Sequence, residues 1–249
     1  MRELISKTNL KPTIGSVQAR SHREELTRRG SLILLVGCTA LLCCLSADAA
    51  EPATVAFVFD FPGSDPEHYS ISVQSDGRAR YERSAPTSTD SDDRETYQTE
   101  FSLSDATRAR VFDLAAQAHY FSGKIDSGKQ KLANTGAKKL TYKDGQREST
   151  ADYNYSPLPA VQQLTTLFQS ISATLEFGRR LAYRHRYQKL ALDDELKRME
   201  DQARHGDLVE LQSVKPVLQE IYADSSVMNV VRARAQRIIE MVPAAAAGR

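Results

Sequence analysis

The spacing between apolar residues changes once along this chain of 249 residues. Up to about residue 155, apolar and polar residues alternate, which is typical of strands that bury one face. From Ser156 onward, apolar residues recur every three or four positions, as in amphipathic helices. A single segment cannot satisfy both periods, so the sequence predicts an α+β fold in two consecutive regions, 50–155 and 156–242.

The first region is predicted to form an antiparallel sheet of five or six strands with a helix on one face. Alternation is strongest in 54–61, and Asp-Gly pairs within 75–77 and 143–145 favour tight hairpin turns. Ser104 is placed to cap a helix that runs to about Ala118. Hairpins at both ends, without strand-helix-strand alternation, indicate antiparallel pairing.

The second region is predicted to be entirely helical and to end in a helical hairpin. Ser156 is a candidate cap with Pro157 at the first helical position. Gly178 lowers helix propensity, so the pattern beyond it indicates either a kinked extension or a second helix. The segments 214–222 and 227–242 pair as the hairpin, which resembles a single HEAT-type unit in shape. The tail 243–249 is predicted to be disordered.

The N-terminal segment 1–49 has the pattern of an extension followed by a cleavable export signal. Two arginines precede the apolar run 31–45, and Ala47 and Ala49 offer small residues before a cleavage site at Ala50. This pattern predicts an exported protein, periplasmic or extracellular. The apolar run is shorter than the about 20 residues that a spanning helix needs, so no transmembrane anchor is expected in the mature chain.

A second form of processing stays open because 35–38, Leu-Val-Gly-Cys, resembles the lipobox of bacterial lipoproteins. That resemblance implies a chain anchored by a lipid on Cys38. Cys43 and Cys44 also fall inside the signal, so cleavage before Ala50 leaves a mature chain without cysteine. Such a chain has neither disulfides nor thiol chemistry and depends on its core for stability.

Charge and short motifs exclude several functional classes. From residue 50 onward there are 26 Lys and Arg against 28 Asp and Glu, so no nucleic-acid partner is expected. The segment 123–129 has the spacing of a phosphate-binding loop, but a helix precedes it and Gln130 replaces the required hydroxyl. The acidic segment 90–95 lacks the glycine of a calcium loop at its sixth position, Glu95. No cofactor and no metal site is therefore predicted.

Histidines do not form a recognisable site in the sequence. Four occur after residue 50, none paired one helical turn apart: His68, His119, His185 and His205. His119 follows the predicted helix and is interpreted as part of a packed aromatic corner with Tyr120 and Phe121 rather than as a catalytic base. No catalytic residue is assigned.

The segment 179–189 concentrates cations around two tyrosines. As a binding surface it would take anionic lipid or acidic polysaccharide through a candidate anion-binding patch. The competing interpretation is a solvated helix with weak ion pairs, such as Glu176 with Arg180 at i,i+4. The patch consists of Arg179, Arg180, Arg184 and Arg186.

Taken together, these features favour an exported envelope protein that is a non-catalytic binding or structural module. Two alternatives are a hydrolase whose site is assembled between sheet and helices, and a module that docks a protein partner.

Overall fold

The structure is a computed structural model that describes residues 51–86, 94–128 and 133–242. All of these residues belong to one compact unit. The predicted export signal with Cys38, most of the acidic segment 90–95 and the tail 243–249 lie outside the described residues. None of the described helices combines the length and the apolarity that a membrane span requires.

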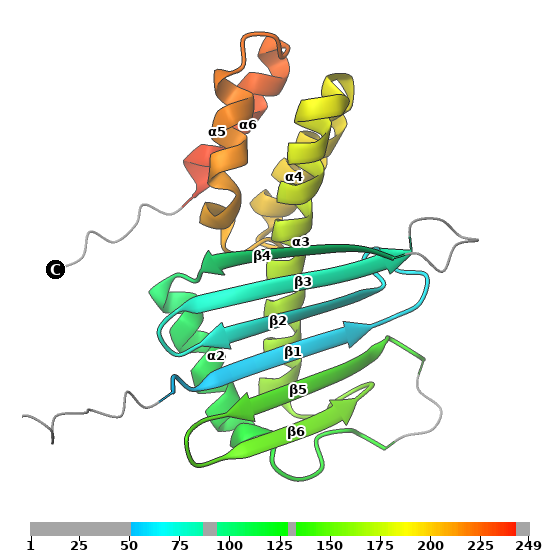
Figure 1. Ribbon diagram of the computed structural model, residues 1–249, viewed down its shortest axis with the longest axis vertical. Coiled ribbons are helices and arrows are strands. Elements are labelled where there is room, and N and C mark those ends of the chain that lie inside the picture. The colour runs from blue at the N-terminus through cyan, green and yellow to red at the C-terminus, as the bar shows by residue number, and fades with distance from the viewer. Residues whose placement is uncertain (1–50, 87–93, 129–132, 243–249) are drawn as a thin grey trace, which may run out of the picture. The chain divides into compact units, whose positions relative to one another are not determined.

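Six antiparallel strands form one sheet, as predicted, and their order in the sheet is β4-β3-β2-β1-β5-β6 (Figure 1). Strands β1 to β4 pair in sequence order as a meander. Strand β5 then pairs with β1 and extends the sheet on its other side. The strands are β1 (Thr54–Asp60), β2 (His68–Gln74), β3 (Arg78–Pro86), β4 (Arg94–Ser102), β5 (Ala137–Lys143) and β6 (Glu148–Tyr153).

Aromatic side chains from alternate strand positions cover one face of the sheet, and helices α2 (Asp105–Gln117) and α3 (Pro159–Tyr187) pack on that face (Figure 1). Ser104 caps α2 as predicted, since its hydroxyl accepts a hydrogen bond from the N–H of Thr107. Phe57 stacks on Phe168 of α3 with ring centroids 5.2 Å apart. The opposite face of the sheet carries mainly polar and small side chains.

Helix α3 begins two residues later than the sequence predicts. The hydroxyl of Ser156 accepts the N–H of Leu158, which closes a turn ahead of the helix rather than capping it. Leu158 is extended, with φ −77° and ψ 119°, because a residue before proline is disfavoured in the helical conformation. The first helical residue is therefore Pro159, and the predicted cap at Ser156 and start at Pro157 are wrong.

Helix α3 passes through Gly178 without a break and ends at Tyr187. Glycine is required here by a close approach, because a Cβ at this position would lie 2.5 Å from Cγ1 of Val214. Neither alternative, a kinked extension or a second helix directly after Gly178, is right: the helix continues to Tyr187, and a second helix begins only at Leu192. The break that the sequence suggested at Gly178 falls instead at Gln188.

The helical region is completed by α4 (Leu192–His205), α5 (Lys215–Ala223) and α6 (Asn229–Met241). Gly206 ends α4 in the left-handed conformation, and α5 with α6 forms the predicted hairpin. These helices bury a second apolar cluster around Leu181, Leu196 and Ile238. Because the first half of α3 packs on the sheet and its second half lines this cluster, one helix serves both cores.

Candidate functional site

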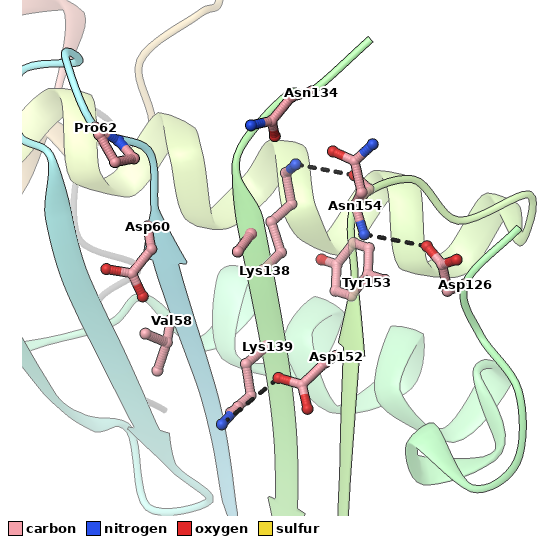
Figure 2. Close-up of a pocket in the computed structure, with 11 residues that line it drawn as sticks. Val58, Asp60, Pro62, Asp126, Asn134, Lys138, Lys139, Asp152, Tyr153 and Asn154 are labelled. Atoms are coloured by element: carbon pink, nitrogen blue, oxygen red, sulfur yellow. Dashed lines mark hydrogen bonds and ion pairs between the residues drawn. The ribbon is translucent and has the colours of Figure 1, made fainter. Parts of the chain in front are cut away.

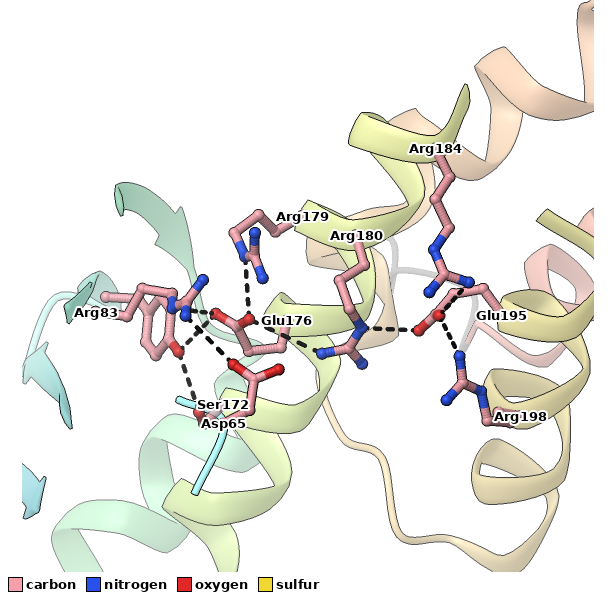
Figure 3. Close-up of polar contacts among 10 residues, drawn as sticks. Asp65, Arg83, Ser172, Glu176, Arg179, Arg180, Arg184, Glu195 and Arg198 are labelled. Carbon is pink, nitrogen blue, oxygen red and sulfur yellow. Dashed lines mark hydrogen bonds and ion pairs between the residues drawn. The ribbon is translucent and has the colours of Figure 1, made fainter. Parts of the chain in front are cut away.

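The arginine-rich segment of α3 is directed at a buried carboxylate on α4 (Figure 3). Glu195 is completely buried, and its carboxylate accepts a hydrogen bond from Nε of Arg180 at 2.8 Å. It also forms an ion pair at 2.7 Å with Nη1 of Arg184, which donates its hydrogen bond to the carbonyl oxygen of Ala191. Arg198, one turn further along α4, approaches the same carboxylate at 2.6 Å. Three guanidinium groups therefore share one negative charge, which leaves a local surplus of positive charge.

A second buried carboxylate joins the same segment to the sheet. Glu176 of α3 accepts the hydroxyl of Tyr81 at 2.9 Å and Nε of Arg179 at 3.0 Å. Nε of Arg83, a buried side chain of β3, lies 3.5 Å away as an ion-pair partner. Burial and the Glu176 carboxylate raise the pKa of the Tyr81 hydroxyl, so it stays a donor. Both oxygens of Glu176 are thus occupied at the boundary between sheet and helices.

The four residues predicted as an anion-binding patch do not form one surface. Arg179, Arg180 and Arg184 turn toward the two buried glutamates. Arg186 points elsewhere, with its guanidinium 5.3 Å from the ring centroid of Tyr187. The predicted i,i+4 pair of Glu176 and Arg180 is present, but at 3.9 Å it is longer than the contact of Arg180 with α4.

A pocket of about 310 Å³ opens beside these charges, at the junction of the sheet, the loop after β1 and helices α3 and α4. We call it the junction pocket. Two of the three guanidiniums that share Glu195, those of Arg180 and Arg198, line it. Its wall includes one exposed carboxylate, Asp65, which Arg83 contacts at 3.3 Å. The other polar side chains of the wall are Ser64, Gln169, Ser172, Glu176 and Gln202.

Helix α4 carries a second glutamate in the same kind of setting. Glu200 is buried and contacts Arg204, Arg234 and Arg237 at 2.5 to 2.8 Å. The hydrogen bond from Arg237, with further help from Arg234, lowers the pKa of Glu200 to about 2. None of these residues lines the junction pocket. The cluster around Glu200 therefore resembles the cluster around Glu195, but it does not adjoin the junction pocket.

A larger pocket of about 680 Å³ lies at the edge of the sheet near β5 and β6 (Figure 2). Its most unusual group is the ammonium of Lys138, which donates to the carbonyl oxygens of Thr135, Gly136 and Asn154 at 2.9 to 3.0 Å. Burial lowers the pKa of Lys138. This ammonium is held by backbone and has no carboxylate partner among the described residues.

The remaining polar groups of that pocket largely satisfy one another. Asp126 accepts the N–H groups of Asn154 and Gly128 at 3.1 and 2.7 Å, and Asp152 pairs with Lys139 at 3.5 Å. Few donors or acceptors are left for a ligand. The bond to Gly128 also bears on the phosphate-loop resemblance of 123–129, because this N–H is already paired with a carboxylate of the same segment; Lys129 and Gln130 lie outside the described residues.

On the open face of the sheet, His68 lies near an acid and a serine, the residue types of a hydrolase triad. Nδ1 of His68 lies 2.5 Å from a carboxylate oxygen of Asp60, and Ser84 is opposite His68 in the strand register. The hydroxyl of Ser84 accepts a hydrogen bond from Nε of Arg94 at 2.6 Å. Among the described residues no hydrogen bond joins His68 to Ser84, so the three side chains do not form a proton relay.

The other histidines are dispersed. His119 is exposed, which corrects the interpretation that it packs in an aromatic corner. Residues 119–121 all have positive φ, so the chain reverses direction after α2. Phe121 is the buried residue of the three, and the ring of Tyr120 contacts that of Tyr142. His185 contacts Asp224 at 2.9 Å. Within the described part of the chain no group of three potential metal ligands comes together.

The sequence interpretation missed the buried charged residues that hold the helices together and join them to the sheet, chiefly Glu195, Glu200 and Arg83. The first two carry a signal that could have been used. Both glutamates fall within the apolar stripe of α4 beside Leu196 and Met199, where an acid must find buried partners. Arg83 carries an equivalent signal, because it follows Ala79 and Tyr81 at alternate positions of β3 and so falls on the buried face.

No known protein-family model matches this chain, and no characterised protein matches it well enough to count as a relative. The structure therefore defines the class no further than an α+β protein, with a pocket lined in part by Arg180 and Arg198 where a sheet meets a helical region.

Proposed function

We propose that this protein is a non-catalytic binding module, exported to the cell envelope, that holds an acidic ligand in the junction pocket. The export part of the proposal rests on the signal pattern in 1–49. The binding part rests on one observation: Arg180, Arg184 and Arg198 share the single carboxylate of Glu195, and two of them line the pocket.

The chemistry of the pocket favours a carboxylate or phosphate group. A guanidinium offers several N–H donors in a plane and binds such groups through paired hydrogen bonds. Arg198 is the more available of the two, since its side chain is 60% exposed and makes one contact with Glu195. A pocket of about 310 Å³ suits a small acid or the acidic end of a polysaccharide.

The same geometry favours binding over hydrolysis. A general base in the junction pocket would need a carboxylate with a free lone pair, and Glu176 is the buried carboxylate that lines this pocket. Its oxygens already accept Tyr81 and Arg179 and lie beside Arg83 and Arg180. A carboxylate held in this way is fixed in place and has its oxygens already engaged, which suits a scaffold.

The proposal is tested by isothermal titration of the purified protein with citrate and with inorganic phosphate at constant ionic strength. We expect saturable binding that weakens about tenfold in Arg198→Gln, as expected for the loss of one charge-assisted contact. Arg204→Gln is the matched control. Arg204 is on the same helix, is 57% exposed and pairs with a buried glutamate, but it does not line the pocket.

Equal affinities in wild type and Arg198→Gln would contradict the pocket, as would equal weakening in both variants, which would indicate a diffuse charge effect. Export is tested separately by the intact mass of the protein recovered from a Gram-negative host. We expect a cysteine-free chain beginning near Ala50. A lipidated chain beginning at Cys38, or an uncleaved chain, would contradict that part of the proposal.

A further inference from the structure

Large apolar side chains are exposed at one end of the helical region. Of the seven such side chains in the described residues, six lie at the end of α3 and around the turn between α5 and α6. Leu190 is 84% exposed and Tyr187 is 62% exposed. Figure 1 shows these helix ends on the side of the helical region away from the sheet. We call this surface the distal tip; it comprises Tyr183, Tyr187, Leu190, Tyr222, Met228 and Val230.

Polar contacts hold the two parts of the distal tip together. Asp224, in the turn between α5 and α6, accepts Nε2 of His185 at 2.9 Å and Nζ of Lys189 at 2.7 Å. The hydrogen bonds from Lys189 and Ser226 lower the pKa of Asp224, so the contact persists well into acid. The backbone that carries the apolar side chains is therefore held in place, so binding of a partner costs little conformational entropy.

The composition of the distal tip is that of a protein interface. Tyrosine, methionine and arginine are enriched in the energetic centres of interfaces. Here the arginines also stack on the tyrosines: the guanidinium of Arg186 lies 5.3 Å from the ring centroid of Tyr187, and that of Arg232 lies 5.8 Å from the ring centroid of Tyr222. Two of the exposed tyrosines thus each have an arginine beside the ring.

The unpaired charges in this part of the chain indicate which kind of partner the distal tip binds. Within the described chain, Arg186 and Arg232 have no ion-pair partner, and neither have the nearby acids Asp194 and Glu220. A surface for anionic lipid would carry one sign of charge, whereas equal numbers of both signs let a surface meet its own copy without net repulsion. We propose that the distal tip is the contact through which two copies of this protein form a two-fold symmetric dimer.

The test is the molar mass of the purified protein, measured by sedimentation equilibrium over a range of concentrations. We expect a reversible dimer of wild type, and a dissociation constant raised at least tenfold in Tyr187→Ser and in Leu190→Ser. The matched control is Tyr155→Ser, because Tyr155 is 45% exposed but lies just after β6, outside the distal tip. Far-UV circular dichroism confirms that each variant is folded.

Three outcomes would overturn the proposal. The first is a wild-type protein that stays monomeric at the highest concentration. The second is a dimer that the tip substitutions leave intact. The third is a monomer that sediments with phosphatidylglycerol vesicles and loses this property in Leu190→Ser, which would assign the distal tip to a membrane surface.

Discussion

The sheet half and the helical half of this molecule are stabilised in different ways. The apolar cluster under the sheet contains 24 buried residues, eight of them aromatic. The cluster between α3, α4, α5 and α6 contains 14, of which Phe177 is the one aromatic residue. In place of further apolar residues, α4 buries Glu195 and Glu200, each in contact with three arginines.

The difference shows how a small helical core can be fixed in one arrangement. Apolar packing is not directional and stabilises in proportion to area. A buried carboxylate with three guanidinium partners contributes less net stability, because desolvation offsets the attraction, but it accepts few geometries. The sheet half should therefore respond mainly to cavities, and the helical half to changes of charge.

The largest effect is expected from Phe57→Ala. This side chain is completely buried and stacks on Phe168, so its removal should cost about 3–5 kcal/mol of unfolding free energy. Because α3 belongs to both cores, tyrosine fluorescence and far-UV circular dichroism should report a single urea transition, shifted to lower urea. Helices that persist after the sheet has unfolded would show that the two halves are independent.

A smaller loss is expected from Glu195→Gln, which leaves three arginines facing a neutral amide. We expect a cost of about 2 kcal/mol, below the full penalty for an unpaired buried charge, because the guanidiniums are partly exposed and can be hydrated. The matched control is Glu82→Gln on the open sheet face, where the pair with Arg80 is exposed and should contribute less than about 0.5 kcal/mol. Equal costs in urea unfolding would remove the distinction between the two halves.

A pH-dependent effect is expected from Glu200, whose contribution to stability is present near neutral pH and is lost in acid. Its pKa is lowered from an ordinary value of 4.5 to about 2 in the folded state, so the folded form favours the ionised carboxylate. The resulting stability is fully present above about pH 4.5 and is lost as the pH falls toward 2. Urea unfolding of wild type and Glu200→Gln at several pH values should therefore converge in acid; a constant difference would contradict this account.

Much of the fold could be predicted from the sequence because its signals are local. Alternating residues in 54–61 and Asp-Gly pairs fixed the strands and turns, and Ser104 identified the start of α2. The start of α3 was missed because two prolines compete for its first turn, and only the conformation of Leu158 decides between them.

The candidate site could be predicted only in outline, because its contacts join segments far apart in the chain. Arg180 is one helical turn from Glu176, as the spacing suggests, but its shorter contact is with Glu195, 15 residues away on another helix. Which arginine turns inward depends on how α3 packs on α4. No periodicity in one segment carries that information.

The helix shared by the two cores also has a consequence for synthesis of the chain. The strands are complete when residue 153 has been made, but the apolar face they create is covered by Phe168 and its neighbours on α3. Until about residue 175 has left the ribosome, the part of the aromatic surface that α3 covers stays exposed, and α2 is the one helix available to pack on the sheet. The sheet therefore cannot complete its folding as a separate domain before α3 has been made. A nascent chain paused before about residue 175 would expose apolar surface that chaperones can bind.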